Sequence, residues 1–600
     1  MKPLVTTTMA LLTLLSASAA AAEQAPAQAL APATPAWVAR SNVNAQYLLA
    51  VQAPFNPERA SDLGLAEYDS QVADLRPGSD ARERAALAKA RDELKARLAR
   101  EADEPVQQDL QILIDAAEEN IKGSKLQEQY LLGWVDVPRQ VFSGLRGLLD
   151  DQTPPERRAK AVERLNRYAG LAPNTQAMTQ LAIAYFNEGL GHPERLYPFK
   201  LELDRALANA PTYLKGIREG FEHAGLKGHE PALAALEKQF DAYQNWTKET
   251  VLPKARTDFR LPPALYAFRL QQVGIDIDPQ ALVQRGQLEY AETRAAMQAL
   301  APQIARARGE PVTSDYRAVI RALKKNQLDR SAIEPYYKGI NKQLEAIIAR
   351  EKIVNLPERP MIMRLASDAE SAAQPAPHFL PAPLIGNTGQ QGQFVLPLDN
   401  PGVGTEGKYD DFNYQAAAWT LSAHEGRPGH ELQFTALIER GVSLARSIFA
   451  FNSVNVEGWA LYAEAESLPY EPLEGQMIAL QLRMLRAARA MLDPMLNLGL
   501  IDRERAGKVL REEVMLSEPM ARQELDRYTF KAPGQAGSYF YGYSRLMQLR
   551  TETELRLGER FDRKAFNNFV LDLGLLPPDL VANAVRARFE GAAPGAGKKN

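Results

Sequence analysis

The sequence predicts a mainly helical protein, built as one large helical fold with a small β element near residues 360–400. Segments rich in Ala, Leu, Glu, Lys and Arg recur at helical spacing along the chain. Pro, Gly, Asn or Asp lies at or near the ends of these segments. Because 45% of the 600 residues are hydrophobic, the chain can also bury a large core.

The N-terminus has the pattern of a secretory signal peptide. Lys2 supplies a basic start, the stretch from Met9 to Leu15 is apolar, and small residues ending at Ala22 fit a cleavage site. We expect export to remove residues 1–22, and residues 23–36 to form a linker. The alternative, an anchor helix, is disfavoured because the apolar stretch is too short to span a bilayer. The mature protein is expected in the periplasm or outside the cell, without stable membrane insertion.

Residues 37–354 are predicted to form an N-terminal helical region. Its expected helical segments are 79–125 with a break at 103–105, 155–171, 174–188, 231–249, 279–308 and 332–353.

Residues 355–410 are rich in Pro and Gly, and their runs 361–366 and 392–398 favour a small sheet. The run 402–407 fits the spacing G-x-G-x-x-G, but no helix start follows it directly. A flexible loop beside an active site is therefore a better interpretation than a dinucleotide site.

The composition restricts the chemistry. With 71 basic and 74 acidic side chains, the chain lacks the positive field that attracts nucleic acid, so we expect no nucleic-acid partner. The absence of cysteine excludes thiolate nucleophiles, disulfides and cysteine-ligated metals. Any metal must be held by carboxylates and by some of the six histidines.

The segment HEGRPGH places His424, Glu425 and His430 within seven residues. On an unbroken helix the six-residue step between the histidines turns by about 600°, so the two rings could not share a metal. Pro428 is expected to break the helix, with Gly426 and Gly429 in left-handed turns. His424 would then end one helix and His430 begin the next. A kink whose histidines are hydrogen-bonded structural groups explains these residues equally well.

A second segment, residues 456–468, has carboxylates on an otherwise apolar helical stripe. Glu457 and Glu464 share this stripe, and a buried carboxylate requires a cation, a metal or a proton. Glu457 is therefore a candidate third metal ligand. Glu466 lies off the stripe, and we expect it to form a salt bridge.

A third segment, residues 533–550, is rich in tyrosine. Tyr539 and Tyr543 share a helical stripe, whereas Tyr541 does not. A phenol near a zinc site can donate a hydrogen bond to a developing oxyanion. Taken alone, this segment also fits a helix whose tyrosines only pack.

With these three segments, the sequence resembles the bacterial family catalogued as domain of unknown function 885, a group placed among zinc metallopeptidases. The resemblance covers most of the mature chain. It is sharpest at HEGRPGHELQ (424–433), EGWALYAE (457–464) and PGQAGSYFYG (533–542). Glu431 stands where the family often has a further histidine.

The resemblance implies a gluzincin-like zinc peptidase whose helical lobes enclose a deep channel, similar in outline to neurolysin. It implies that His424, His430 and Glu457 bind Zn²⁺, that Glu425 is the general base, and that Tyr539 stabilises the transition state. Residues 355–600 would form the catalytic region, and the substrate would be a peptide. The alternatives are a catalytically inactive peptide-binding protein of the cell envelope and a helical scaffold. The sequence favours no particular oligomeric state.

Overall fold

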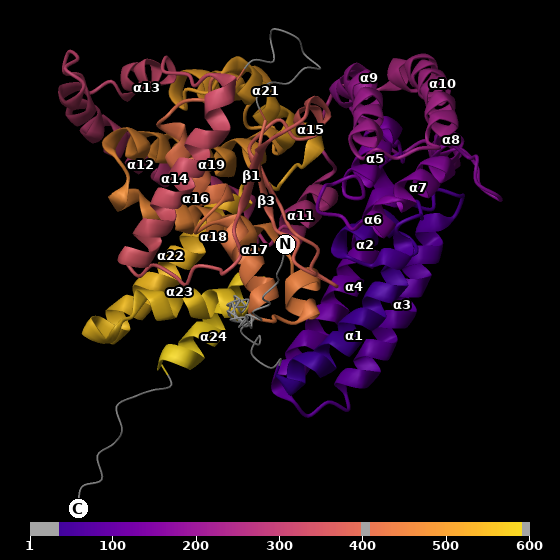
Figure 1. The fold of residues 1–600 in the computed structure, drawn as a ribbon, viewed down its shortest axis with the longest axis horizontal. Coiled ribbons are helices and arrows are strands. Elements are labelled where there is room, and N and C mark those ends of the chain that lie inside the picture. The colour runs from indigo at the N-terminus through magenta and orange to yellow at the C-terminus, as the bar shows by residue number, and fades with distance from the viewer. Residues whose placement is uncertain (1–34, 398–408, 591–600) are drawn as a thin grey trace, which may run out of the picture. The chain divides into compact units, whose positions relative to one another are not determined.

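The computed structural model describes residues 35–397 and 409–590, which belong to one compact unit. The protein is mainly helical, as predicted (Figure 1). The predicted signal peptide (1–22), most of the predicted linker (23–36) and the glycine-rich run 402–407 lie outside the described residues.

The first helices of the chain cover most of the predicted N-terminal helical region. They are α1 (Ala36–Gln52), α2 (Pro57–Leu63), α3 (Ser79–Leu98), α4 (Glu104–Tyr130), α5 (Val137–Arg146), α6 (Pro155–Arg158), α7 (Lys160–Tyr168), α8 (Met178–Gly189), α9 (Lys200–His223) and α10 (Glu230–Trp246). The helices that follow are α11 (Pro263–Gln272), α12 (Pro279–Ala307), α13 (Tyr316–Lys324) and α14 (Arg330–Arg350).

The second half contains the remaining helices. They are α15 (Asp368–Ala373), α16 (Ala417–Glu425), α17 (His430–Glu439), α18 (Ser453–Ser467), α19 (Leu473–Asn497), α20 (Arg503–Lys508), α21 (Glu518–Asp526), α22 (Ser538–Leu557), α23 (Arg563–Asp572) and α24 (Pro578–Glu590). The expected break at 103–105 falls between α3 and α4, and the expected helix 155–171 is divided into α6 and α7.

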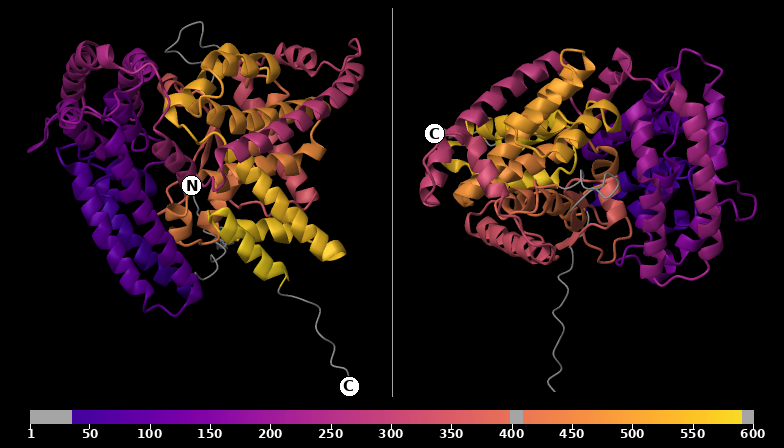
Figure 2. Two further views of the ribbon diagram at one scale, coloured as in Figure 1. Left: turned by 180° about the vertical axis from the view of Figure 1, so that it is seen from behind. Right: turned by 90° about the horizontal axis from the view of Figure 1, so that it is seen from above.

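The helices pack around separate hydrophobic clusters. One cluster joins α1, α3 and α4, and α3 and α4 run side by side (Figures 1 and 2). A second joins α5, α7, α9 and α10. The largest cluster includes α12, α14, α16, α17, α18, α19 and α22, with α12 along α19 and α18 along α22. This third cluster includes residues of both histidine-bearing helices, so the candidate site lies within the largest hydrophobic cluster of the described residues.

The predicted β element is a three-stranded sheet of β1 (Ile362–Leu365), β2 (His378–Leu380) and β3 (Gln393–Leu396). The central strand, β3, is buried along its length; it pairs with β1 in parallel and with β2 in antiparallel orientation. The prediction of a small β element near residues 360–400 is therefore confirmed.

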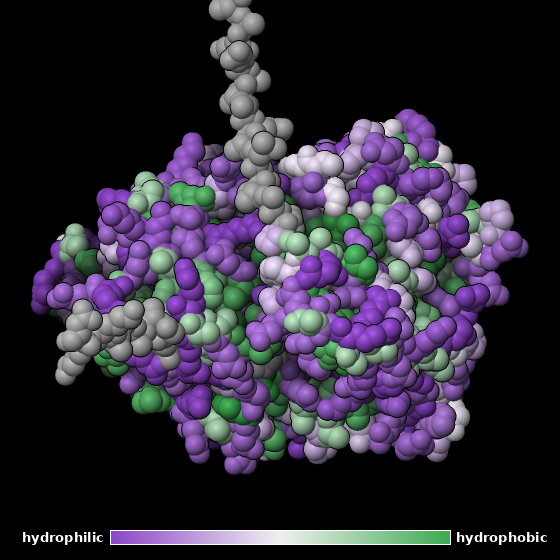
Figure 3. Space-filling model, turned by 90° about the horizontal axis from the view of Figure 1, so that it is seen from below, coloured by the Kyte–Doolittle hydropathy of each residue, from purple (hydrophilic) through white to green (hydrophobic). Residues whose placement is uncertain are grey.

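On the face seen in Figure 3, hydrophilic side chains predominate and hydrophobic ones form small separate groups. Within the part of the chain that the structure describes, no helix combines the length and the apolar character that crossing a membrane requires.

Candidate metal centre

The kink between α16 and α17 determines where the two histidines lie. Helix α16 ends directly after His424, and α17 begins at His430, so the helix boundaries are those predicted from the sequence. The expected left-handed turns are wrong, because Gly426 has φ −96° and Gly429 has φ −76°. Glycine is needed at 429 for another reason: a Cβ atom there would lie 1.9 Å from the His424 carbonyl oxygen.

Three helices bring the predicted metal ligands together. The Nε2 atom of His424 on α16 and that of His430 on α17 lie 3.5 Å and 3.3 Å from Glu457 Oε2 on α18. Three ligand atoms, one from each of these residues, all lie within 4.8 Å of one another. Both imidazoles are buried.

The donor set fits a divalent metal such as zinc. Two imidazoles and one carboxylate are the ligands of an open catalytic zinc site. Glu457 Oε2 is buried, yet it has no hydrogen-bond partner among the described residues, although a buried carboxylate oxygen normally has one. A cation among the three side chains would satisfy this oxygen and both Nε2 atoms.

Charge coupling within the site is strong. Burial opposes the charged form of His424, but its contacts with Glu457 and Glu464 outweigh burial and raise its pKa to about 9. Burial also disfavours the charged form of Glu457, but the contacts with His424 and His430 hold its pKa well below the usual range. Without a metal, the Glu457 carboxylate and the His424 imidazolium therefore stabilise each other as opposite charges.

Glu464 fixes the orientation of His424. The His424 Nδ1 atom lies 2.6 Å from Glu464 Oε1, and the Thr420 hydroxyl donates to Glu464 Oε2 at 2.7 Å. Arg486 Nη2 lies 3.3 Å from the same carboxylate. Burial would raise the pKa of Glu464, but Arg486 and His424 lower it, so the group accepts as a carboxylate. A proton on Nδ1 leaves the Nε2 lone pair of His424 available to a metal.

Glu425 is buried beside the ligands. Its Oε1 lies 3.9 Å from His424 Nε2, and it lines the same cavity. Burial raises its pKa, which suits a group that exchanges a proton near neutral pH.

Tyr539 reaches the site because α22 crosses α18 at very short range. A Cβ atom at Gly542 would lie 1.9 Å from the Val454 carbonyl oxygen and 2.8 Å from Gly458 Cα. The Tyr539 ring consequently lies 6.2 Å from the His424 ring, centroid to centroid. Burial raises the pKa of Tyr539, so its hydroxyl remains a hydrogen-bond donor.

The neighbouring tyrosines point elsewhere. The Tyr541 hydroxyl bonds to Asp276 and accepts a hydrogen bond from Arg545 Nη1 at 2.9 Å. The Tyr543 ring lies under Arg483, whose Cζ is 4.8 Å from the ring centroid. Of the three tyrosines, Tyr539 is the one that lines the cavity containing the candidate ligands.

This cavity has a volume of about 630 Å³. The candidate ligands line it together with Glu425 and Tyr539, and Arg59 of α2 and Arg139 of α5 also reach it. A second cavity of about 500 Å³ shares Arg59 and Glu457 with the first, so the two adjoin.

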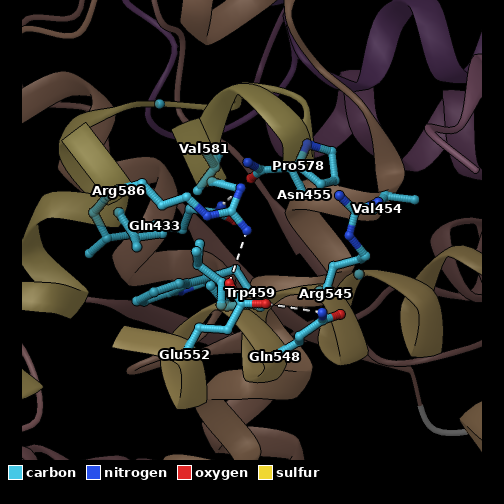
Figure 4. A pocket seen from close by; sticks show the side chains of 18 residues that line it. Gln433, Val454, Asn455, Trp459, Arg545, Gln548, Glu552, Pro578, Val581 and Arg586 are labelled. Carbon is cyan, nitrogen blue, oxygen red and sulfur yellow. Dashed lines mark hydrogen bonds and ion pairs between the residues drawn. The ribbon is translucent and has the colours of Figure 1, made fainter. Parts of the chain in front are cut away.

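A separate pocket of about 100 Å³ holds none of the predicted site residues (Figure 4). In it, Arg586 donates to Glu552 at 2.9 Å, and Gln548 also donates to Glu552. Trp459 lines this pocket and donates to the Pro428 carbonyl at 3.0 Å. The pocket thus adjoins a residue that supports the kink, but it has no candidate catalytic group.

Two glutamates named in the sequence have structural partners. Glu431 is bound by Arg427 at 2.6 Å within the kink. Glu466 pairs with Arg550, as its position off the stripe predicts.

The arginines that line the cavity were not predicted from the sequence. Two of them, Arg486 and Arg489, are buried on α19, and Arg483 has the same three-residue spacing on this helix but does not line the cavity. Charges repeated at helical spacing within an apolar segment were the available signal.

Comparisons with known proteins assign the chain to a family. The family described as "Bacterial protein of unknown function (DUF885)" matches residues 57–585. No curated protein gives a significant match.

Two solved structures share the fold. A crystal structure described as "the putative lipoprotein from Colwellia psychrerythraea" has 18% identity and a TM-score of 0.71, covering 92% of this chain and 99% of that one. A structure described as "a putative lipoprotein of unknown function from Shewanella oneidensis" has 17% identity and a TM-score of 0.65, covering 91% of this chain and 99% of that one.

Proposed function

The chain belongs to the bacterial family DUF885, and we propose that it is an exported zinc-dependent peptidase that hydrolyses peptides with a metal-activated water. One observation carries the proposal: His424, His430 and Glu457 converge within 4.8 Å from three helices, and Glu457 Oε2 is buried without a hydrogen bond. The same cavity contains a buried glutamate and a buried tyrosine beside these ligands.

In the proposed mechanism His424, His430 and Glu457 would hold Zn²⁺, which when bound would supply Lewis-acid activation of a water near neutral pH. Glu425 takes a proton from the attacking water and passes it to the leaving amine. The Tyr539 hydroxyl donates a hydrogen bond to the oxyanion that develops on the peptide carbonyl. Glu464 keeps the proton of His424 on Nδ1 throughout.

The proposed export rests on residues 1–22, which have the pattern of a signal peptide. It is also supported by the structural neighbours, both described as putative lipoproteins.

Metal analysis and a cleavage assay test the proposed function. The purified mature protein should hold about one zinc per chain, and mass spectrometry should detect cleavage products from a defined peptide library. Absence of zinc even after zinc is added would disprove the metal site. Bound zinc without any cleavage would favour the inactive peptide-binding alternative.

Glu425→Gln tests the role of the general base. The substitution preserves the size of the side chain and all three ligands, so zinc should remain bound while kcat falls by roughly 10²-fold or more. Glu439→Gln is the matched control, because Glu439 lies at the end of α17 and does not line the cavity. Full activity of Glu425→Gln would remove Glu425 from the mechanism.

A further inference from the structure

The cavity of the candidate metal site carries an excess of positive charge. The cationic side chains that line it are Arg59, Arg139, Arg486, Arg489, Arg527 and Lys531. Among the described residues, its acidic lining consists of Glu425 and Glu457, both already placed in the metal site. A recessed cavity with this balance attracts an anionic group.

Some of these cations already have carboxylate partners. Arg489 donates to both oxygens of Glu524, at 2.7 Å and 2.6 Å, and Arg486 contacts Glu464. By contrast, the side chains of Arg139 and Lys531 form no ion pair with any described carboxylate.

Arg527 is the cation with the clearest unmet hydrogen bond. It begins a π-helical turn, η8 (Arg527–Lys531), and its Nη1 atom is buried without a hydrogen-bond partner among the described residues. The nearest carboxylate, Glu524, lies 3.8 Å from Nη1 and is already bound by Arg489. A buried guanidinium N–H without an acceptor is unfavourable, so an anionic oxygen from a ligand would stabilise it.

Lys531 lines the same cavity as Arg527. Its side chain is accessible to solvent but recessed in the cavity, and burial lowers its pKa to about 8. Asp526 opposes this shift, whereas Arg139, Arg205 and Arg527 add to it by repulsion. An anion bound here would relieve that repulsion.

Arg527 lies close enough to the metal ligands to contact a short peptide bound there. Arg527 Nη2 is 3.5 Å from the Tyr539 hydroxyl, and Arg527 Cζ is 5.5 Å from the Tyr539 ring centroid. The same ring lies 6.2 Å from the ring of His424. The distance from Arg527 Cζ to the His424 ring is therefore no greater than the length of about four residues of extended peptide.

We infer that Arg527, Lys531 and Arg139 bind a carboxylate of the peptide substrate, close to the bond that is cleaved. This inference rests on the proposed function and adds a substrate class to it: short peptides, or chain ends, that carry a carboxylate near the scissile bond. The C-terminus and an acidic side chain offer the same chemistry. Arg527 positions the peptide and takes no part in bond cleavage.

Binding to the Glu425→Gln protein tests the inference without turnover. The probes are an N-acetylated five-residue peptide of alanine and phenylalanine as the free acid, the same peptide as its C-terminal amide, and an amide with aspartate as its last residue. Calorimetry should show the free acid binding about 10- to 100-fold more tightly than the plain amide, as expected for charge-assisted hydrogen bonds. Tight binding of the aspartyl amide would show that the carboxylate of an acidic side chain is recognised as well as that of the C-terminus.

Equal dissociation constants for the free acid and both amides, including no binding by any, would overturn the inference. That outcome is independent of the proposed function, which instead fails when the wild-type protein cleaves no peptide.

Arg527→Gln should weaken binding of the free acid by about 10-fold or more and leave the plain amide unchanged. Arg205→Gln is the control, because Arg205 neighbours Lys531 but pairs with Asp526 and does not line the cavity. An equal loss for both peptides in Arg527→Gln, at unchanged thermal stability, would show that Arg527 does not recognise the carboxylate.

Discussion

Tyr539 and Tyr543 lie on one face of α22, but their hydroxyl groups have different surroundings. Tyr539 lines the cavity beside His424, whereas Tyr543 packs under Arg483. A hydroxyl that donates to an oxyanion should contribute mainly to kcat, because the oxyanion exists only in the transition state.

We therefore expect Tyr539→Phe to lower kcat by roughly 10²- to 10³-fold, with KM, zinc content and thermal stability close to wild type. Tyr541→Phe and Tyr543→Phe are the controls and should have much smaller effects. Steady-state kinetics of the three variants provide the measurement. If Tyr539→Phe is active and another variant is not, the donor is a different tyrosine.

Glu464 offers a test of ligand orientation. Glu464→Gln removes the charge that holds His424 Nδ1, so the affinity for zinc should fall by about 10- to 100-fold. Glu466→Gln is a matched control on the same helix, because Glu466 pairs with Arg550 and does not contact His424. Competition with a chromophoric chelator measures both affinities. An unchanged zinc affinity in Glu464→Gln would show that this hydrogen bond is structural.

Among single residues, the sequence was most informative about those whose side chains belong to the few types that bind metal. Few residue types bind metal, so His424, His430 and Glu457 could be selected before their distances were known. Their assignment as ligands stays a prediction until metal is measured. Arg527 could not be selected, because arginine is common and only the fold shows that its Nη1 lacks a partner.

The helices bring the site together at two close contacts that require glycine. One is the kink, where Gly429 touches the carbonyl of His424, and the other is the crossing of α18 and α22 at Gly458 and Gly542. Glu457 directly precedes one of the crossing glycines, and Tyr539 lies one turn before the other. Helix separation therefore controls how closely these two side chains approach.

Gly542→Ala should force α18 and α22 apart, because the new methyl group would overlap the Val454 carbonyl. We expect a destabilisation of about 1–3 kcal/mol, the usual cost of overpacking, together with weaker zinc binding and lower activity. Gly339→Ala is the control, since a Cβ atom there meets nothing within 4 Å. Thermal unfolding and zinc titration are the measurements. A Gly542→Ala protein with normal zinc affinity would show that the crossing does not position Glu457.

Helix positions were largely predictable, because the periodic segments and their Pro and Gly boundaries are local features of the sequence. The expected segments 279–308 and 332–353 correspond closely to α12 and α14. The backbone at Gly426 and Gly429 was predicted wrongly, since a close approach between distant atoms leaves no local signal. The pairing of α18 with α22 also depends on contacts between segments far apart in the chain.

At the scale of the whole molecule, the cavity combines segments far apart in the sequence. Arg59 of α2 and Arg139 of α5 line the same cavity as His424 and Glu457. Periodicity and motif spacing relate residues that are near in sequence, so they could not predict that Arg59 and Arg139 share a cavity with His424 and Glu457. The predicted division at residues 354 and 355 stays a prediction, and residues on both sides of it contribute to the candidate site.

Because the candidate ligands lie on three helices of the largest core cluster, metal binding should stabilise the folded chain as a whole. A ligand that binds only the native state at 100 times its dissociation constant adds about 2.7 kcal/mol to the free energy of unfolding. We expect free zinc at that excess to raise the unfolding temperature, and a chelator to reverse the shift. Calorimetry or circular dichroism measures it. Glu457→Ala removes one ligand and should show no shift under the same conditions, whereas Glu439→Gln should respond like wild type. An equal shift in Glu457→Ala would mean that zinc stabilises the protein from another site, and the three side chains would then be structural groups rather than metal ligands.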